Sequence, residues 1–238
     1  MPLSALWPGG PLFDPGGGVP LGMDSLLLAD FAKAPRGRAL ELCCGSGAVS
    51  LLLLSRIPAL EADCIELLSG PAEDAARNFA ANGLERRARV INGDIRAHRK
   101  LVEPGAYALC VCNPPYFPAG SGSPPSDPVR AVARSEMECT LSDVLDAAAW
   151  ALKNGGALDI VHRPERLAEL LAEMRSRALE PKRLRLVQRT AESAPSLILA
   201  EGRRGAAPGL KIEPPLIICS PDGGESGEYR RICHRGDG

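Results

Sequence analysis

Short, strand-like apolar segments alternate with helical segments along most of this chain. A strand that leads into a helix and then into another strand is typical of parallel βαβ units, which build a sheet covered by helices on both faces. The sequence therefore predicts an α/β fold with a doubly wound sheet, mostly parallel, and an antiparallel strand at one edge. The expected strands span residues 38–42, 62–66, 89–91, 109–112, 157–161, 183–188, 196–200 and 216–219. The expected helices span residues 25–32, with Asp24 as N-cap, residues 48–54, 71–82 and 164–178, and a segment that ends at Leu152 and is capped by Thr140 or Ser142.

Length and composition favour a single large domain. A chain of 238 residues, 45% of them hydrophobic, can bury a substantial core. Residues 1–21 are rich in glycine and proline and lack periodicity, so they are expected to form a loose leader before a domain that spans residues 22–238. The net charge of −1 gives no evidence for nucleic-acid binding, so any RNA-binding surface must be local.

Eight cysteines occur without regular spacing. Several lie in apolar segments, where free thiols pack as small hydrophobic side chains, which indicates a reducing cytoplasm. No paired CxxC motif or histidine set accompanies them, so no metal site is predicted. The longest apolar run, around residues 49–54, is too short to cross a bilayer, and neither membrane insertion nor secretion is expected.

Residues 109–116 read LCVCNPPY. A buried strand is expected to stop at Asn113, because the two prolines that follow cannot continue the hydrogen bonds of a sheet. Pro115 keeps Pro114 out of the helical region, so the Pro114 carbonyl projects beside the Asn113 amide oxygen. Two acceptors and the aromatic ring of Tyr116 suit a planar substrate with an exocyclic NH2 group. Taken alone, the motif also fits an ordinary turn, because Asn-Pro often starts one.

Polar residues follow the other expected strands at the same edge, where open α/β sheets bind their ligands. Gly45-Ser46-Gly47 follows the first strand and lets a ligand approach the backbone closely. Glu66 ends the second strand, where a carboxylate can accept hydrogen bonds from ribose hydroxyls, and Asp94 follows the third, where it can accept one from an adenine amino group. Each signal alone also fits a tight turn or a solvated acid. No third glycine or alanine stands where a pyrophosphate needs one, so the set favours a nucleoside without phosphates.

Several motifs resemble those of class I S-adenosylmethionine-dependent methyltransferases that act on amino nitrogens in planar groups. They are ELCCGSG, the acid of CIELLSG, NGDI and NPPY. The segments GMDSLLLADFA, ARSEMECTLSDV, LKNGG, VHRPERL, LEPKRLRLV, LILAEG and LKIEPPLIIC are further similar to the bacterial tRNA1(Val) (adenine-37-N6)-methyltransferase family, between Gly22 and Cys219. This resemblance implies a Rossmann-like class I methyltransferase sheet, S-adenosyl-L-methionine as cofactor and a tRNA as substrate.

The resemblance also implies roles for individual residues. The target adenine, flipped out of an unpaired loop, would be held by Asn113, Pro114 and Tyr116. Cys43 stands where these enzymes usually carry glycine. Ser135 stands where related sequences carry histidine, which leaves Arg134 and Glu136 as the remaining polar candidates there. The cofactor would be held by residues from the strand ends and the upstream helix: Asp24, Glu41, Cys43, Gly45, Gly47, Glu66, Asp94, Ile95 and Asn113.

Other functions stay open at this point. Asn-Pro-Pro elbows also occur in glutamine-N5 methyltransferases of release factors and in guanine-N2 rRNA methyltransferases. A non-catalytic RNA-binding module with a decayed cofactor site is a further alternative, whereas a nicotinamide oxidoreductase is disfavoured because the pyrophosphate fingerprint is lacking. RNA contacts would come from basic clusters, although a solvated surface is the simpler explanation for each of them. The clusters lie at residues 86–89, 182–185, 203–204 and 230–231.

Overall fold

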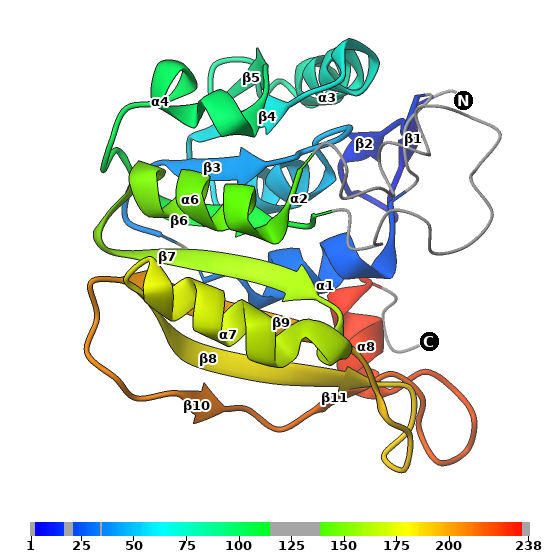
Figure 1. Ribbon diagram of the computed structural model, residues 1–238. Helices are drawn as coiled ribbons and strands as arrows, with labels where there is room; N and C mark the ends of the chain where they lie inside the picture. The colour runs from blue at the N-terminus through cyan, green and yellow to red at the C-terminus, as the bar shows by residue number, and fades with distance from the viewer. Residues whose placement is uncertain (1–2, 17–20, 34, 115–138, 235–238) are drawn as a thin grey trace, which may run out of the picture.

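The computed structural model of the protein describes residues 3–16, 21–33, 35–114 and 139–234. A nine-stranded sheet forms its centre, with the strand order β10-β8-β9-β7-β6-β3-β4-β5 and with β11 paired to β8 (Figure 1). The strands from β7 to β5 are all parallel, so the predicted doubly wound α/β class is confirmed. The strands are β3 (Ala39–Leu42), β4 (Ala62–Glu66), β5 (Ala88–Asn92), β6 (Tyr107–Cys112), β7 (Leu152–His162), β8 (Leu179–Gln188), β9 (Pro195–Arg204), β10 (Lys211–Ile212) and β11 (Leu216–Ile217).

Helices cover both faces of the sheet (Figure 1). Successive side chains of a strand point to opposite faces, so Leu109 and Val111 of β6 pack with α1, α2 and α3, while Cys110 and Cys112 pack with α6 and α7. Two hydrophobic cores result, one on each side. The helices are α1 (Met23–Phe31), α2 (Ala48–Arg56), α3 (Ser69–Ala81), α4 (His98–Leu101), α6 (Leu141–Ala151), α7 (Leu167–Ser176) and α8 (Gly227–Ile232), with 3-10 turns η1 (Ile95–Ala97) and η2 (Pro164–Arg166).

The antiparallel strand lies inside the sheet and not at its edge, which corrects the sequence-based expectation. β9 pairs antiparallel with β7 on one side and with β8 on the other. The short connection of residues 189–194 between β8 and β9 permits only an antiparallel hairpin. β10 and β11 then add to β8 in parallel and extend the sheet beyond the hairpin.

Two helix starts were predicted from capping residues, with different outcomes. α1 begins two residues earlier than predicted, with Gly22 as its N-cap, so the prediction of Asp24 as N-cap is wrong. Asp24 lies in the first turn instead, where a carboxylate is favoured by the positive end of the helix. Thr140 does cap α6, because its hydroxyl accepts a hydrogen bond from the Asp143 N–H and the Asp143 carboxylate accepts one from the Thr140 N–H.

The N-terminal residues form a small hairpin against α3. β1 (Ser4–Ala5) and β2 (Leu12–Phe13) pair antiparallel, and the Phe13 side chain is buried in the core beside α3. The side chain of Asn82, just after α3, donates a hydrogen bond of 2.8 Å to the Leu12 carbonyl and accepts one of 2.8 Å from the Leu12 N–H. The boundary between leader and domain after residue 21 stays a prediction.

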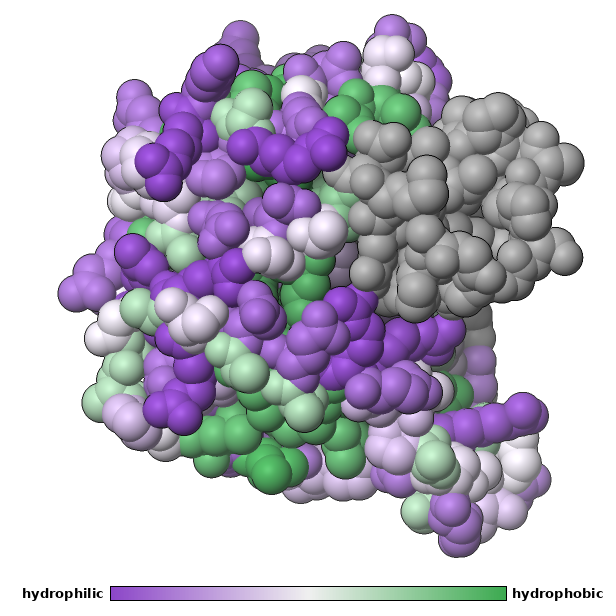
Figure 2. Space-filling view, in the orientation of Figure 1, coloured by the Kyte–Doolittle hydropathy of each residue, from purple (hydrophilic) through white to green (hydrophobic). Residues whose placement is uncertain are grey.

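The surface is mostly hydrophilic on the face shown in Figure 2. Apolar side chains gather along its lower margin, where β8 and β10 form the end of the sheet in Figure 1, and Leu210 and Ile212 are exposed there. Within the described parts of the chain, every helix is too short or too polar to cross a membrane.

Candidate cofactor and substrate site

The carboxyl ends of four neighbouring strands define one edge of the sheet. β6, β3, β4 and β5 are consecutive and parallel, and their registers let them end close to one another. Ligands of open α/β sheets bind outside this edge. The structure therefore brings together four residues singled out by the sequence: Asn113, Cys43, Glu66 and Asp94.

Cys43 begins the loop that follows β3, and its backbone is strained. Its φ of 56° lies in the left-handed region, which costs an L-residue roughly 1–2 kcal/mol relative to the right-handed one. Glycine adopts this conformation without that cost. The backbone thus gives a physical reason for the glycine expected at this position. The Cys43 sulfur lies 3.9 Å from the sulfur of Cys139.

Gly45 and Gly47 give the same loop its shape, with φ values of 54° and 79°. A Cβ placed on Gly47 would lie 2.8 Å from the Phe79 ring, so a side chain there would push the loop away from α3. A Cβ placed on Gly45 would meet none of the described atoms within 4 Å. The loop therefore packs tightly on one side through Gly47 and presents open backbone on the other through Gly45.

Glu66 joins this loop to the start of α3. One carboxylate oxygen accepts a hydrogen bond of 2.8 Å from the Gly45 N–H, and the other accepts one of 3.0 Å from the Leu68 N–H. Burial raises the pKa of Glu66, while these backbone hydrogen bonds oppose the rise. Each carboxylate oxygen can accept a second hydrogen bond. The residues present consequently fit a ligand that offers a pair of hydroxyl groups, as ribose does.

Asn92 supports Glu66 and was not singled out from the sequence. Its side-chain nitrogen donates hydrogen bonds of 2.9 Å to the Glu66 carbonyl and 3.0 Å to the Leu67 carbonyl. These bonds fix the backbone at the end of β4, just before α3 begins. The only signal in the sequence was the position of Asn92 at the start of the NGD turn.

Glu41 lies below the loop, on the face of β3 that packs against α2. It is buried, and its carboxylate accepts a hydrogen bond of 2.8 Å from the Ser50 N–H in the first turn of α2. Burial raises the pKa of Glu41 to about 7. The observed contact stabilises the helix that follows the loop, and direct contact between Glu41 and a cofactor stays a prediction.

Asp94 and Ile95 follow β5. Ile95 is buried, and Asp94 caps η1 by accepting a hydrogen bond of 2.9 Å from the Arg96 N–H. The Arg96 guanidinium also contacts both oxygens of the Asp94 carboxylate, at distances down to 2.6 Å, and lowers the pKa of Asp94. An adenine amino group bound by Asp94 would have to share this carboxylate with Arg96.

The substrate side of the site begins at Asn113. Its side-chain nitrogen donates a hydrogen bond of 3.2 Å to the hydroxyl of Ser25, a buried residue in the first turn of α1. Pro114 is buried next to it, and Asp24 lies half-buried beside Ser25. Ser25 was not predicted from the sequence, because its partner is 88 residues away. Tyr116, Arg134, Ser135 and Glu136 lie outside the described residues.

Most of the basic clusters are held by partners within the protein. Arg87 donates to the carbonyls that follow α2, and Arg89 forms an ion pair of 2.9 Å with Asp63. Arg183 is buried against Glu201, and Arg185 pairs with Glu228. These side chains therefore stabilise the fold, and their availability for RNA is limited.

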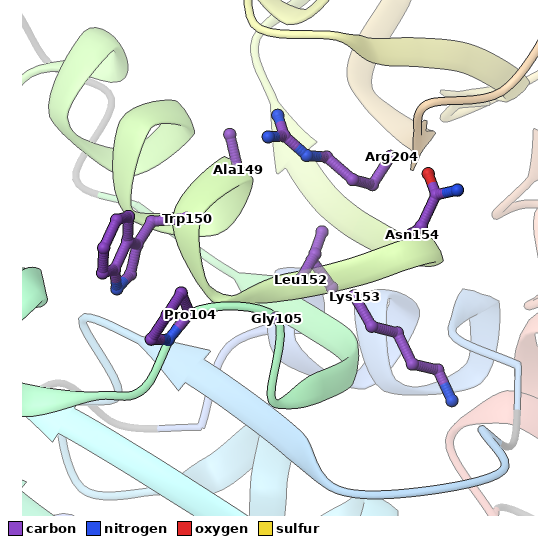
Figure 3. A pocket seen from close by; sticks show the side chains of 8 residues that line it. All are labelled: Pro104, Gly105, Ala149, Trp150, Leu152, Lys153, Asn154 and Arg204. Carbon is purple, nitrogen blue, oxygen red and sulfur yellow. The ribbon is translucent and has the colours of Figure 1, made fainter.

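A hollow of about 490 Å³ lies at the opposite end of the strands from Asn113 (Figure 3). Its lining includes Gly105, just before β6, and Trp150 and Lys153 at the junction of α6 and β7. Lys153 extends away from Arg204 and donates a hydrogen bond of 3.2 Å to the Arg36 carbonyl. This hollow is separate from the edge at which the predicted residues meet.

The chain is similar in sequence to several methyltransferases. A tRNA1(Val) (adenine(37)-N6)-methyltransferase from Porphyromonas gingivalis is 29% identical over 221 residues, which cover 89% of this chain and 86% of that protein. One from Aeromonas hydrophila is 35% identical over 143 residues, covering 59% of this chain and only 58% of that protein. A ribosomal protein uL3 glutamine methyltransferase from Bordetella pertussis is 37% identical over 79 residues, covering 33% of this chain and 26% of that protein.

The fold agrees with solved structures. A predicted O-methyltransferase from Agrobacterium tumefaciens superimposes with a TM-score of 0.72 and 20% identity, covering 91% of this chain and 98% of that one. At this identity the likeness establishes the fold alone. The model of the methyltransferase small domain family matches residues 22–178, more than half of the chain. The chain therefore belongs to the methyltransferase small domain family, and its predicted class, an S-adenosyl-L-methionine-dependent methyltransferase, is confirmed with it.

Proposed function

We propose that the protein transfers a methyl group to the exocyclic N6 amine of an adenine in tRNA, with adenine-37 in the anticodon loop of a valine tRNA as the target. One observation carries this proposal. Asn113 follows β6 directly beside the glycine loop that follows β3, so a side chain that could accept a hydrogen bond from an amine adjoins the loop proposed to bind the nucleoside. The relative from Porphyromonas gingivalis, aligned over most of the chain, bears the name of this activity.

The cofactor would lie along the strand ends. Glu66 would accept hydrogen bonds from the ribose hydroxyls, Asp94 and Ile95 would hold the adenine, and the loop from Cys43 to Gly47 would hold the methionine part, with Glu41 behind it. Asp24 would lie near the amino-acid end, since it adjoins Ser25 and therefore Asn113. When bound, S-adenosylmethionine supplies a methyl group on a positively charged sulfur.

The residues of the elbow orient the amine. The lone pair of an aromatic amine is delocalised into the ring, so the nitrogen is a weak nucleophile. Asn113 and Pro114 accept hydrogen bonds from the two N–H groups of the amine, which turns the nitrogen toward the methyl carbon and stabilises the positive charge that develops on it. The carbon–nitrogen bond forms as the carbon–sulfur bond breaks, and one amine proton leaves to water. No protonatable base is required for the transfer.

Substrate binding would use stacking and a base that is already unpaired. Stacking of the base on Tyr116 would contribute about 1–3 kcal/mol. Extrusion of a base from a duplex costs a few kcal/mol and costs less from a loop, which fits an anticodon-loop target. All eight cysteines are free thiols, a state that a reducing compartment such as the cytoplasm preserves, and we place the proposed reaction there.

The test is methyl incorporation from labelled S-adenosylmethionine into unmodified total tRNA, followed by nucleoside analysis. N6-methyladenosine in valine tRNA is the expected product. Label in another nucleoside, such as guanosine, would show that a different base is the target. Absence of label in tRNA, together with firm cofactor binding, would contradict the proposed substrate and favour a binding module.

A glutamine side chain in a protein is the second candidate substrate. Its amide also carries an NH2 group in a plane, so the acceptors of Asn113 and Pro114 suit it equally. The alignment with the Bordetella pertussis enzyme, although it covers a third of the chain, supports this candidate. Parallel incubations with release factor, ribosomal protein uL3 and tRNA distinguish the two candidate substrates. Label confined to protein would mean that Asn113 binds a glutamine side chain.

A further inference from the structure

Asn78 is a buried polar residue in α3 that no motif singled out. It is 1% exposed, and its side chain makes three hydrogen bonds to backbone atoms of other segments. Its side-chain nitrogen donates hydrogen bonds of 2.9 Å to the Asp14 carbonyl and 3.0 Å to the Ser46 carbonyl. Its side-chain oxygen accepts a hydrogen bond of 2.9 Å from the Asp14 N–H. A buried amide that satisfies so many partners holds them in one arrangement.

The contact with Ser46 lies at the centre of the cofactor loop. The peptide group between Ser46 and Gly47 is hydrogen-bonded through both of its polar atoms. The Ser46 carbonyl accepts a hydrogen bond from Asn78, and the Gly47 N–H donates one of 2.9 Å to the Cys44 carbonyl. The neighbouring Gly45 N–H is held by Glu66. With these three bonds the course of the loop is set by the protein before any ligand arrives.

The N-terminal segment completes the arrangement. The Ser46 hydroxyl donates a hydrogen bond of 3.0 Å to the Pro15 carbonyl. Pro15 directly follows Asp14, whose backbone is hydrogen-bonded to the Asn78 side chain. The hairpin, the loop and α3 therefore meet at Asn78.

Asn82 offers an internal comparison, one helical turn further on. Its side chain donates to the carbonyl of Leu12 and accepts from the N–H of Leu12, just as the side chain of Asn78 does with Asp14. Its nitrogen also donates a hydrogen bond to the Asn78 carbonyl, within the same helix. Both residues anchor the N-terminal segment, and of the two, Asn78 reaches the loop.

We propose that Asn78 is a positioning residue for the cofactor loop: it holds the Ser46–Gly47 peptide in the orientation that S-adenosylmethionine requires. Binding to a loop that is already ordered avoids the free-energy cost of ordering it. Without Asn78 the Ser46 carbonyl loses its partner, and the loop gains alternative conformations that bind less tightly. The inference rests on the proposed use of this loop for the cofactor, and it is independent of which amine receives the methyl group.

The experiment compares Asn78→Ala with Asn82→Ala by calorimetric titration with S-adenosylhomocysteine, at a temperature below the thermal midpoint of each variant. Both variants lose hydrogen bonds to the N-terminal segment, so both are expected to unfold at a lower temperature. Asn78→Ala alone is expected to raise the Kd, by about tenfold, which corresponds to one buried hydrogen bond of about 1.4 kcal/mol. In steady-state assays its KM for the cofactor should rise while its kcat stays within about twofold of the wild-type value.

Asn78→Asp provides a second variant if Asn78→Ala does not fold. Its carboxylate still accepts a hydrogen bond from the Asp14 N–H but cannot donate one to the Ser46 carbonyl, so a Kd raised about tenfold is expected. Equal Kd values for Asn78→Ala, Asn82→Ala and wild type would overturn the inference, as would an unchanged Kd for Asn78→Asp where Asn78→Ala is unfolded. A failure of the proposed function would be distinct, because the order of the Kd values would persist while tRNA remained unmethylated.

Discussion

The side-chain nitrogen of Asn113 donates a 3.2 Å hydrogen bond to the hydroxyl of Ser25, which connects the end of β6 to the first turn of α1. An amide whose nitrogen is held in this way has a defined direction for its oxygen. The oxygen is the atom that would accept a hydrogen bond from the target amine. A helix that precedes the whole sheet in the sequence thus orients the side chain on which the proposed transfer depends.

Ser25→Ala is expected to lower kcat roughly tenfold, because the amide of Asn113 loses its anchor while its chemistry remains. The Kd for S-adenosylhomocysteine should stay at the wild-type value. Ser25→Thr keeps the hydroxyl and should restore most of the activity. A Ser25→Ala variant with an unchanged kcat would show that Asn113 is oriented by other contacts.

Asn113→Ala is expected to reduce turnover by about a hundredfold or more, as loss of one transition-state hydrogen bond does elsewhere. Cofactor affinity should remain largely intact, since the loop after β3 and Glu66 are untouched. Single-turnover methylation and titration with S-adenosylhomocysteine measure the two effects separately. Equal losses in both would contradict the division of the site into a cofactor side and a substrate side.

Asp94→Ala is expected to weaken cofactor binding, with a smaller effect on kcat at saturating cofactor. Arg96→Ala is the matched control, because it removes the partner of Asp94 and leaves the carboxylate available to an adenine amino group. Its Kd for S-adenosylhomocysteine should be unchanged or lower. A loss of affinity in Arg96→Ala that matches the loss in Asp94→Ala would mean that the ion pair, and not the carboxylate, is what the ligand needs.

Cys43→Gly is expected to stabilise the protein by about 1 kcal/mol, because glycine adopts a φ of 56° without the steric cost that a Cβ brings. Cys43→Ala separates this backbone effect from the loss of the sulfur, since it keeps the Cβ and should destabilise. Urea unfolding of the three proteins measures the difference. Stabilisation by alanine as well as glycine would locate the strain in the packing of the thiol.

Asp159→Asn is expected to flatten the dependence of stability on pH. Asp159 is buried on β7 beside Glu201, with Arg183 at 3.7 Å, and burial raises its pKa to about 8. A raised folded-state pKa gives stability that is complete below the unfolded value near 4 and is lost as pH rises toward 8. The pKa of Glu201 is lowered, so its contribution is already present above pH 5. Thermal midpoints from pH 5 to 8 should therefore fall less in the variant than in wild type, and parallel curves would contradict the assignment.

The sequence predicts the parts of the site that depend on local pattern. Strand ends, the glycine loop and the elbow each have a signature within a few residues, and the acids at Glu66 and Asp94 follow from where strands stop. The start of β7 was predicted less well. No loop separates α6 from β7, so β7 begins at Leu152 and not at the expected residue 157. Gly155, with a φ of 76°, therefore lies within the strand. A glycine pair reads equally well as a helix terminator or as an irregular strand, and only the pairing with β6 decides.

The residues that hold the site in place could not be predicted in this way. Ser25, Asn78 and Asn92 act through side-chain contacts with segments that are 25 to 88 residues away, and no periodicity records such contacts. The two-residue strands β10 and β11 exist because β8 offers an edge to pair with. Arg87 looked like part of a basic surface, although its guanidinium is used to bind the carbonyls at the end of α2.

The hairpin contact between Leu12 and Asn82 spans 70 residues, and this separation has a consequence for synthesis of the chain. The hairpin leaves the ribosome before α3 and has no surface to dock on until α3 has followed it. Once residue 82 is out, the hairpin, the glycine loop and α3 can close on one another, while Asn113 has yet to emerge. The half of the protein that would receive the methyl donor can thus assemble before the half that would present the amine.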